Sequence, residues 1–320
     1  MKAIILKEHG DASNLVLAEL SIPTPGPKEV LVKVRAVAIN PSDTYIRSLE
    51  SLDYVFNGER PRVLGWDIAG VVTQIGNDVV EFEIGDEVFG GINFAGHDYP
   101  GHGKGYAEYV AAPVKDLAKK PSNISFEEAA AACMAALTAW QPLHKAQIKP
   151  GDRVLIVPAG GGVGHYAVQI AKYLGAYVIG ITSSGKMDFV KGLGADEVID
   201  YTSQRFEDVV APVDLVLDGL RGDHIGRSLT VIKQGGKLIS LFNEIAGTHW
   251  EKIAAEKGVN AYYNAVISDG NDMKQIAALL ASGKLRSHVT RTFPLEQTAD
   301  AHRELELDKT QGKIVISISE

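Results

Sequence analysis

The stretch Val154-Leu-Ile-Val-Pro-Ala-Gly-Gly-Gly-Val-Gly164 decides the fold of this 320-residue chain. Its first four residues form a continuous apolar run, which is typical of a strand buried on both faces. The glycines that follow permit a tight turn and let backbone amides approach a phosphate. Apolar residues then recur at helical spacing, at Ala167, Ile170, Ala171 and Leu174. A strand, a glycine-rich turn and a helix in this order predict a dinucleotide site whose pyrophosphate lies at Gly161, Gly162, Val163 and Gly164.

The chain beyond this turn alternates between strands and helices. We expect strands at Tyr177–Thr182, Val198–Tyr201, Val213–Asp218 and Lys237–Phe242, with helices at Lys186–Leu193 and His224–Ile232. Alternation at this rhythm is typical of parallel βαβ units with right-handed crossovers. The sequence therefore predicts an α/β fold with a Rossmann-type doubly wound parallel sheet.

The two ends of the chain have a different pattern. Residues 1–122 contain short β-branched runs separated by Pro and Gly turns, and a similar pattern returns from Ser287. Between them, Ser125 is a candidate N-cap for an Ala-rich helix that runs to about Leu143. We therefore expect a β-rich domain made of residues 1–122 and 287–320, with the doubly wound domain, residues 123–286, inserted in it.

Composition excludes several classes of protein. The single cysteine, Cys133, cannot form an intrachain disulfide or supply a four-cysteine zinc site. Asp and Glu number 40 against 32 Lys and Arg, and a net charge of −8 argues against nucleic-acid binding, which depends on neutralising phosphates. The apolar runs Ala3–Leu6 and Ala129–Leu137 are too short for a secretory signal and a membrane span, respectively. We expect a cytoplasmic protein.

The end of the second strand of the βαβ run should select the dinucleotide. An acidic residue about 20 positions beyond the glycines would bind the ribose hydroxyl of NAD. This chain instead has Thr182-Ser-Ser-Gly-Lys186, whose hydroxyl groups and lysine suit a 2′-phosphate. The sequence therefore favours NADPH over NADH, although Lys186 also fits an ordinary solvated lysine and the nearby Asp188 weakens the argument.

Several short motifs occur in an order and spacing that together are specific. They are Ala38-Ile-Asn-Pro-Ser-Asp43 with Tyr45, Val63-Leu-Gly-Trp-Asp-Ile-Ala-Gly-Val71, Gly85-Asp-Glu-Val-Phe-Gly90, Gly105-Tyr-Ala-Glu-Tyr109, Ala136-Leu-Thr-Ala139, Gly192-Leu-Gly-Ala-Asp-Glu-Val-Ile-Asp-Tyr201 and Gly312-Lys-Ile-Val-Ile316. With them, nearly the whole chain resembles the medium-chain dehydrogenase/reductase family. Within it, the chain is most similar to the zinc-independent quinone oxidoreductases and the enone and alkenal reductases. The resemblance implies a GroES-like fold for the β-rich domain.

The resemblance also implies a role for individual residues. Asn40 and Tyr45 should be catalytic, lying near the nicotinamide and the substrate carbonyl, and Asp43, Trp66 and Phe94 should line the substrate pocket. The implied cofactor contacts beyond the glycine-rich turn are Thr138, Ser183, Ser184, Lys186, Tyr201, Leu241, Phe242 and Lys313. A structural role remains open for several of them: Asn40 as a cap, Tyr45 and Trp66 as packing residues, Thr138 bonded to its own helix, and Tyr201 packed at a strand end.

No metal is expected. Zinc-dependent members of the family have a Cys where this chain has Asn40 and a His-Glu pair where it has Trp66-Asp67, and neither Asn nor Trp is a zinc ligand of that kind. His97, Asp98 and His102 lie close together in the sequence, but no fourth ligand is evident.

The resemblance leaves two functions open. The first is an NADPH-dependent reductase of quinones or α,β-unsaturated carbonyls, with a small electrophile as substrate. The second is an NADPH-binding redox sensor or structural protein without turnover. Relatives often dimerise through an edge strand, and Asn260–Ser268 is the candidate for that strand in an expected homodimer.

Overall fold

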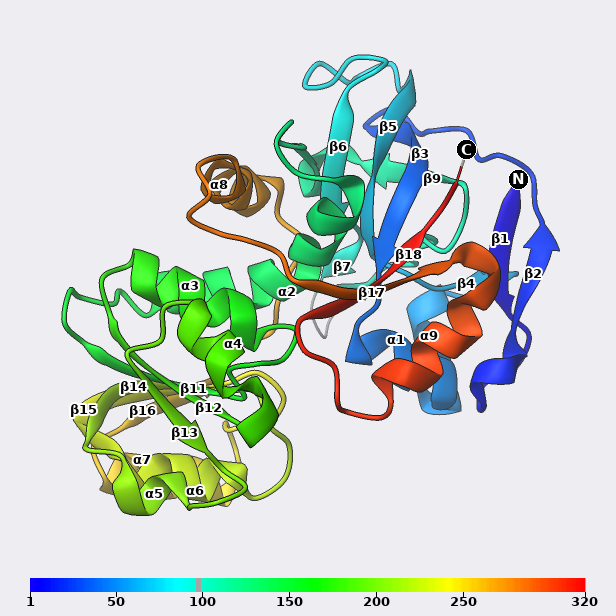
Figure 1. Cartoon of the computed structure of the whole chain (residues 1–320). Helices are drawn as coiled ribbons and strands as arrows, with labels where there is room; N and C mark the ends of the chain where they lie inside the picture. The colour runs from blue at the N-terminus through cyan, green and yellow to red at the C-terminus, as the bar shows by residue number, and fades with distance from the viewer. Residues whose placement is uncertain (96–98, 320) are drawn as a thin grey trace. The chain divides into compact units, whose positions relative to one another are not determined.

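The computed structural model describes residues 1–95 and 99–319. The chain divides into two compact units (Figure 1). The first consists of residues 1–137 and 266–320, and the second of residues 138–265. The helix α2 (Phe126–Lys145) begins in the first unit and ends in the second. The domain boundaries expected from the sequence, at residues 122/123 and 286/287, stay a prediction.

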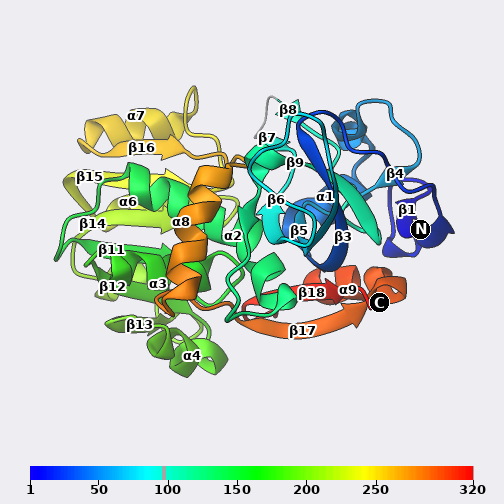
Figure 2. The ribbon, with the colours of Figure 1, turned by 90° about the horizontal axis from the view of Figure 1, so that it is seen from above.

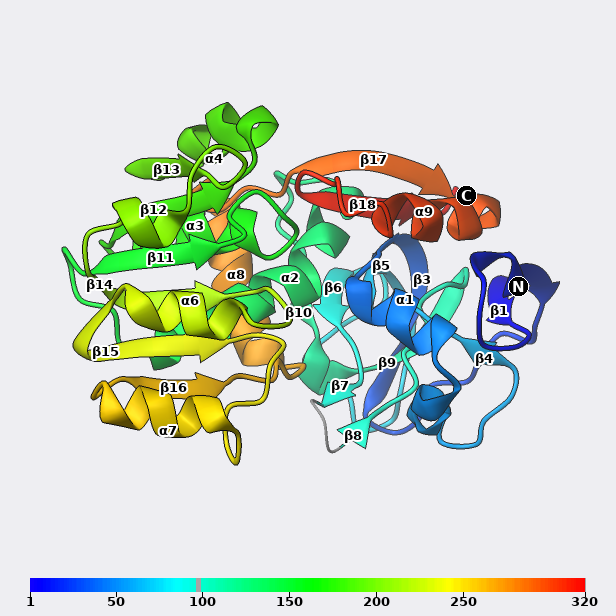
Figure 3. The ribbon, with the colours of Figure 1, turned by 90° about the horizontal axis from the view of Figure 1, so that it is seen from below.

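The second unit is built on a parallel sheet with the strand order β13-β12-β11-β14-β15-β16. Figures 2 and 3 show these strands side by side in this order. Their bounds are β11 (Arg153–Val157), β12 (Tyr177–Thr182), β13 (Glu197–Asp200), β14 (Val213–Asp218), β15 (Ile232–Ser240) and β16 (Asn260–Tyr263). The doubly wound α/β fold expected from the alternating pattern is confirmed.

Helices cover both faces of this sheet. They are α3 (Gly164–Tyr173), α4 (Met187–Gly192), α5 (Phe206–Val209), α6 (His224–Thr230) and α7 (His249–Glu256). Figure 1 shows α3 and α4 on one side and α5, α6 and α7 on the other. The strand order therefore reverses between β11 and β14, and this is the point at which open parallel sheets bind ligands, beyond the carboxyl ends of their strands.

The first unit is β-rich. Its main sheet has the order β10-β6-β5-β3-β18-β17, with β9 also paired to β3, and smaller sheets are formed by β2-β1-β4 and β7-β8. The bounds are β1 (Lys2–Leu6), β2 (Leu15–Glu19), β3 (Glu29–Ala38), β4 (Arg62–Val63), β5 (Asp67–Ile75), β6 (Glu87–Gly91), β7 (Phe94–Ala95), β8 (Tyr99–Pro100), β9 (Tyr109–Pro113), β10 (Ala118–Lys119), β17 (Val289–Pro294) and β18 (Lys313–Ser317). Its helices are α1 (Pro41–Ser48), α8 (Gly270–Ala281) and α9 (Thr298–Leu305). The C-terminal strand β18 pairs with β3, so the two ends of the chain complete one sheet.

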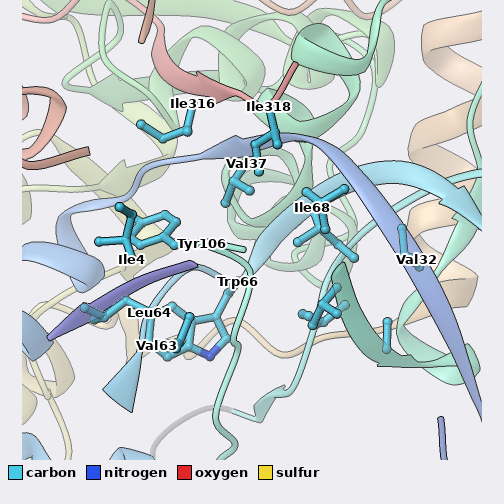
Figure 4. Close-up of a cluster of buried hydrophobic side chains, with 14 of the residues drawn as sticks. Ile4, Val32, Val37, Val63, Leu64, Trp66, Ile68, Tyr106, Ile316 and Ile318 are labelled. Carbon is cyan, nitrogen blue, oxygen red and sulfur yellow. The ribbon is translucent and has the colours of Figure 1, made fainter. Parts of the chain in front are cut away.

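The core of the first unit brings together residues that are far apart in the sequence (Figure 4). Trp66 and Ile68 pack in one cluster with Val37 of β3 and Ile316 of β18, and all four side chains are at most 1% exposed. Burial of side chains of this size contributes about 1.5–3 kcal/mol each to folding. The cluster therefore secures the strand ends that carry the polar residues described below.

Across the described residues, no helix is both long and apolar enough to cross a bilayer.

Candidate functional site

The glycine-rich turn lies between β11 and α3. At Gly164, where α3 begins, a Cβ atom would lie 1.9 Å from the carbonyl oxygen of Pro158, so no side chain fits there. At Gly161, by contrast, an added Cβ would meet nothing closer than Pro158 Cγ at 3.9 Å. The backbone of the turn is thus closely packed at Gly164, whereas there is open space beside Gly161.

The open side of the turn presents unengaged donors. The amide of His165 donates to the carbonyl of Gly161, and the amides of Tyr166 and Ala167 donate to Val163. In the part of the chain that the structure describes, the amides of Gly161, Gly162 and Val163 donate to no protein group. Free amides at a helix N-terminus are suited to an anionic phosphate. The turn therefore fits the pyrophosphate of a dinucleotide.

The end of β12 carries the residues expected to select NADPH. Ser183 and Lys186 are half-buried and Ser184 is exposed. Burial lowers the pKa of the Lys186 ammonium. An added Cβ at Gly160 would lie 3.1 Å from Lys186 Cδ, so the lysine stem passes beside the glycine-rich turn. The structure thus brings Lys186 and the turn together.

Asp200, at the end of β13, has a role that the sequence did not reveal. Its carboxylate accepts a hydrogen bond from Ser184 Oγ at 2.6 Å, and from the amide and hydroxyl of Thr202 at 2.9 and 2.7 Å. The hydrogen bond from Ser184 makes the largest contribution to lowering the pKa of Asp200. Asp200 therefore positions Ser184, while its neighbour Tyr201 is exposed.

Three further residues of the second unit are expected to contact the cofactor, and they differ in exposure. Thr138 is half-buried in α2, and Leu241 is buried just after β15. Phe242 is 40% exposed, and the guanidinium of Arg221 lies 4.9 Å from its ring centre. Their contacts with a cofactor stay a prediction.

Asn40 lies at the first turn of α1, in the first unit. Pro41 occupies the first helical position, where the missing amide costs no hydrogen bond. The Asp43 carboxylate accepts from the Asn40 amide at 2.6 Å and so caps the helix. Asn40 is thus the N-cap residue of α1, and its amide and Asp43 belong to a capping box. A catalytic role for Asn40 stays a prediction.

The Asn40 side chain is held between two buried charged residues. Its Nδ2 donates to Asp67 Oδ2 at 2.9 Å, and its Oδ1 accepts from Lys313 Nζ. Lys313 also donates to the carbonyl of Ile39 at 2.8 Å, and its Nζ lies 3.9 Å from Asp67 Oδ2. Asn40 is 9% exposed, whereas Asp67 and Lys313 are 0% and 3% exposed.

Strand register explains why these three residues meet. Asp67 pairs with Ala38 at the end of β3, on one side of the strand. On the other side Val315 pairs with Ala38, so β18 begins beside the residues that follow β3. The loop at Asn40 is therefore flanked by the first residue of β5 and the first residue of β18.

Burial sets the electrostatics of this cluster. It raises the pKa of Asp67 to about 6, against the opposing effect of the Lys313 ammonium. Burial also raises the pKa of Asp43 to about 7, and it lowers the pKa of Lys313. Asp67 Oδ1 accepts from the amide of Met134 at 3.0 Å, which adds a fixed partner to the carboxylate.

The other substrate-side candidates differ in exposure. Tyr45 is 36% exposed on α1, which makes its side chain more accessible than a core aromatic would be. Trp66 is 1% exposed, donates from its indole to the carbonyl of Gly101 at 2.9 Å, and packs edge-on against Phe94. Trp66 is thus packed in the core, and Phe94 is held by hydrogen bonds to Ser268 through its backbone. Their place in a substrate pocket stays a prediction.

The histidine group singled out in the sequence is only partly visible. His97 and Asp98 lie outside the described residues. His102 is buried, its Nε2 accepts from the amide of Val63 at 3.0 Å, and burial lowers its pKa to about 4. Among the described side chains, no group of three His, Cys, Asp or Glu residues has the arrangement of a metal site.

A second buried polar group lies beside α1. Asp43 and Arg47 share one face of the helix, four residues apart, and Arg47 forms an ion pair with Glu306. The Tyr106 hydroxyl lies 3.1 Å from His302 Nε2, and burial lowers the pKa of His302 to about 3. No sequence signal pointed to this group, because Tyr106 and His302 meet only in the folded chain.

Two family models match this chain. Residues 26–122 match the alcohol dehydrogenase GroES-like domain, and residues 193–316 match the model described as zinc-binding dehydrogenase. The 2-methylene-furan-3-one reductase of Solanum lycopersicum is 34% identical over 99% of this chain and 79% of its own length. The chain belongs to the medium-chain dehydrogenase/reductase superfamily.

Solved structures of this superfamily have the same fold. The match to the quinone oxidoreductase of Coxiella burnetii covers 100% of this chain and 99% of the Coxiella chain, with a TM-score of 0.91 and 34% identity. The quinone oxidoreductase of Escherichia coli was solved in complex with NADPH. The match covers 99% of this chain and 100% of the Escherichia coli chain, with a TM-score of 0.86 and 28% identity. The GroES-like fold expected for the β-rich part is confirmed.

Proposed function

We propose that this protein is an NADPH-dependent oxidoreductase that reduces quinones or α,β-unsaturated carbonyl compounds by hydride transfer. The observation that carries the proposal is the set of free amides at Gly161, Gly162 and Val163, beside Lys186 and at the start of α3. The relatives support the same chemistry, since they include a 2-methylene-furan-3-one reductase and a quinone oxidoreductase bound to NADPH.

The proposed reaction assigns different roles to residues of the two units. In the second unit, the free amides and Lys186 would hold the pyrophosphate and the 2′-phosphate. Bound NADPH would supply a hydride and would thereby be oxidised to NADP⁺. The β-carbon of an enone then gains a C–H bond, the electron pair of the C=C bond moves toward the carbonyl oxygen, and water protonates the resulting enolate. In the first unit, Asn40 would lie near the nicotinamide and Tyr45 would donate a hydrogen bond to that oxygen, as the resemblance implies.

A turnover panel tests this function directly. NADPH oxidation is followed by absorbance with a quinone, a 2-alkenal and a vinyl ketone as acceptors. We expect binding of NADPH at micromolar concentrations and turnover of at least one acceptor. A protein that binds no NADPH contradicts the proposal, and one that binds NADPH but reduces no acceptor would be the redox sensor or structural protein instead.

The proposal includes catalysis without zinc. Support comes from Asn40 and Trp66, because the first is bound to Lys313 and Asp67 and the second is a buried packing residue. A buried ammonium beside Asn40 would repel a dication at this position.

We also propose that the protein is a cytoplasmic homodimer. β16 is an edge strand of the parallel sheet, and an exposed edge offers backbone groups to a second copy. The lone cysteine, Cys133, is buried and free, so folding needs no oxidising compartment. A solution mass equal to the 34.3 kDa chain would contradict the dimer, and cell fractionation tests the compartment.

A further inference from the structure

Asn40 is the residue whose role the structure defines most closely. Its carboxamide has two hydrogen-bonding ends, and each end meets a buried partner of opposite character. Oδ1 faces the Lys313 ammonium, and Nδ2 donates to the Asp67 carboxylate. Turning the amide over would place its NH₂ group against the ammonium and its oxygen against the carboxylate. Both contacts would be repulsive, and the repulsion would be strong because these buried groups are poorly screened by water. The amide therefore has a single orientation.

That orientation decides what Asn40 can still offer. A carboxamide nitrogen carries two N–H groups, and Asp67 uses one of them. The carbonyl oxygen accepts a charged donor, which draws electron density from the amide and strengthens the other N–H as a donor. Asn40 is 9% exposed while both partners are almost fully buried, so Asn40 is the residue of this cluster that is most accessible to a ligand.

We propose that the free N–H of Asn40 is a catalytic donor to the substrate oxygen that gains negative charge on hydride transfer, and that Lys313 and Asp67 are positioning residues acting through it. The inference rests on the proposed reductase function and deepens it. A donor fixed before the reaction stabilises a developing oxyanion without reorganising, which is how such donors accelerate reactions. Lys313 thus serves the reaction from a buried position, in place of the cofactor contact expected from the resemblance.

A double-mutant comparison separates this role from a structural one. Asn40→Ala should lower kcat roughly 10²-fold, as removal of one oxyanion donor does. Lys313→Met should lower kcat by about tenfold or more because the carboxamide is no longer fixed. The double variant should be no slower than Asn40→Ala alone, since Lys313 acts through Asn40. The dissociation constant of NADPH, measured by fluorescence, should be the same in all three.

Lys120 provides the matched control. It is also a buried lysine of the first unit, with 4% of its side chain exposed, and it donates to the carbonyls of Pro121 and Ile124. Lys120→Met should lower the melting temperature and leave kcat unchanged. If Lys313→Met destabilises the fold too far to be assayed, Lys313→Met combined with Asp67→Asn removes both charges together and permits the same comparison.

A readout without turnover keeps this inference separate from the proposed function. The side-chain amide protons of Asn40, observed by NMR in the free protein, should exchange slowly in the wild type and faster in Lys313→Met, with Lys313→Arg restoring slow exchange. Three results would overturn the inference. The first is an unchanged exchange rate of the Asn40 amide protons in Lys313→Met, and the second is a loss of kcat from Lys313→Met that is equal in the wild type and in the Asn40→Ala variant. The third is a Lys313→Met variant that binds NADPH more weakly and keeps the kcat of the wild type. Failure of the wild type to bind NADPH would instead contradict the proposed function.

Discussion

Gly161→Ala tests whether the open side of the glycine-rich turn is the phosphate site. The substitution adds one methyl group where the structure offers room, because the nearest atom to the added Cβ is Pro158 Cγ at 3.9 Å. Gly161 is also absent from the glycines with positive φ, so an alanine needs no strained backbone. The free protein should therefore fold as before, and the melting temperature should stay the same or rise.

The magnitudes follow from these contacts. Replacing an unstrained glycine by alanine stabilises a protein by about 0.4–1 kcal/mol, because the unfolded chain loses freedom. If a phosphate approaches the free amides at Gly161, the methyl group displaces it and weakens at least one hydrogen bond to a charged group, worth about 1.5–3 kcal/mol. At 1.4 kcal/mol per tenfold, the dissociation constant of NADPH should rise roughly 10- to 150-fold.

The assay compares three glycine variants by thermal melting and by fluorescence titration with NADPH. Gly192→Ala is the control, because an added Cβ there meets nothing within 4 Å and the residue lies in α4, outside the turn. It should bind NADPH as the wild type does. Gly164→Ala should lose stability, since its Cβ would lie 1.9 Å from a backbone oxygen. The reasoning fails if Gly161→Ala is folded and binds NADPH as tightly as the wild type.

Three further outcomes are expected. Lys186→Ala should weaken NADPH far more than NADH in parallel titrations, and an equal effect on both would remove the 2′-phosphate role. For Asp43, burial raises the pKa in the folded state to about 7, above its ordinary value of 3.8. The folded state therefore binds more protons between these values and loses stability as pH rises. Relative to Asp43→Asn, the wild type should lose about 3 kcal/mol of unfolding free energy from pH 4 to pH 7 in denaturant titrations, whereas parallel curves would show that Asp43 does not titrate there. Activity should be unchanged by chelators, and elemental analysis of the purified protein should find no stoichiometric zinc. One zinc per chain would contradict catalysis without a metal.

Much of the fold could be predicted because its signals are local. The capping pair at Ser125 and Glu128 begins α2 as expected, with hydrogen bonds of 2.9 and 3.1 Å between the two residues. The run Val154–Val157 lies in β11, and the glycines follow it as expected. Each of these features depends on residues within about one turn of one another.

Of the helices that the sequence analysis did not predict, α7 had a local start signal. α7 occupies part of the segment 243–258, which the sequence interpretation left without a structure. Thr248-His-Trp-Glu251 has the spacing of a capping box, and Thr248 accepts from the amide of Trp250 while Glu251 accepts from Gly247. The start signal and the amphipathic pattern after it were both present in the sequence, so this helix could have been predicted.

By itself, the sequence determined the α/β fold, the glycine-rich turn between β11 and α3 and the family, because these depend on spacing along the chain. It also pointed to Asn40 as a residue of interest. Only the tertiary structure decided what surrounds Asn40, since Asp67 and Lys313 lie 27 and 273 positions away. The register of β5 and β18 on β3 brings those charges to one loop, and burial there makes their interactions strong. No pattern of neighbouring residues encodes such a register, because it results from the packing of the whole sheet.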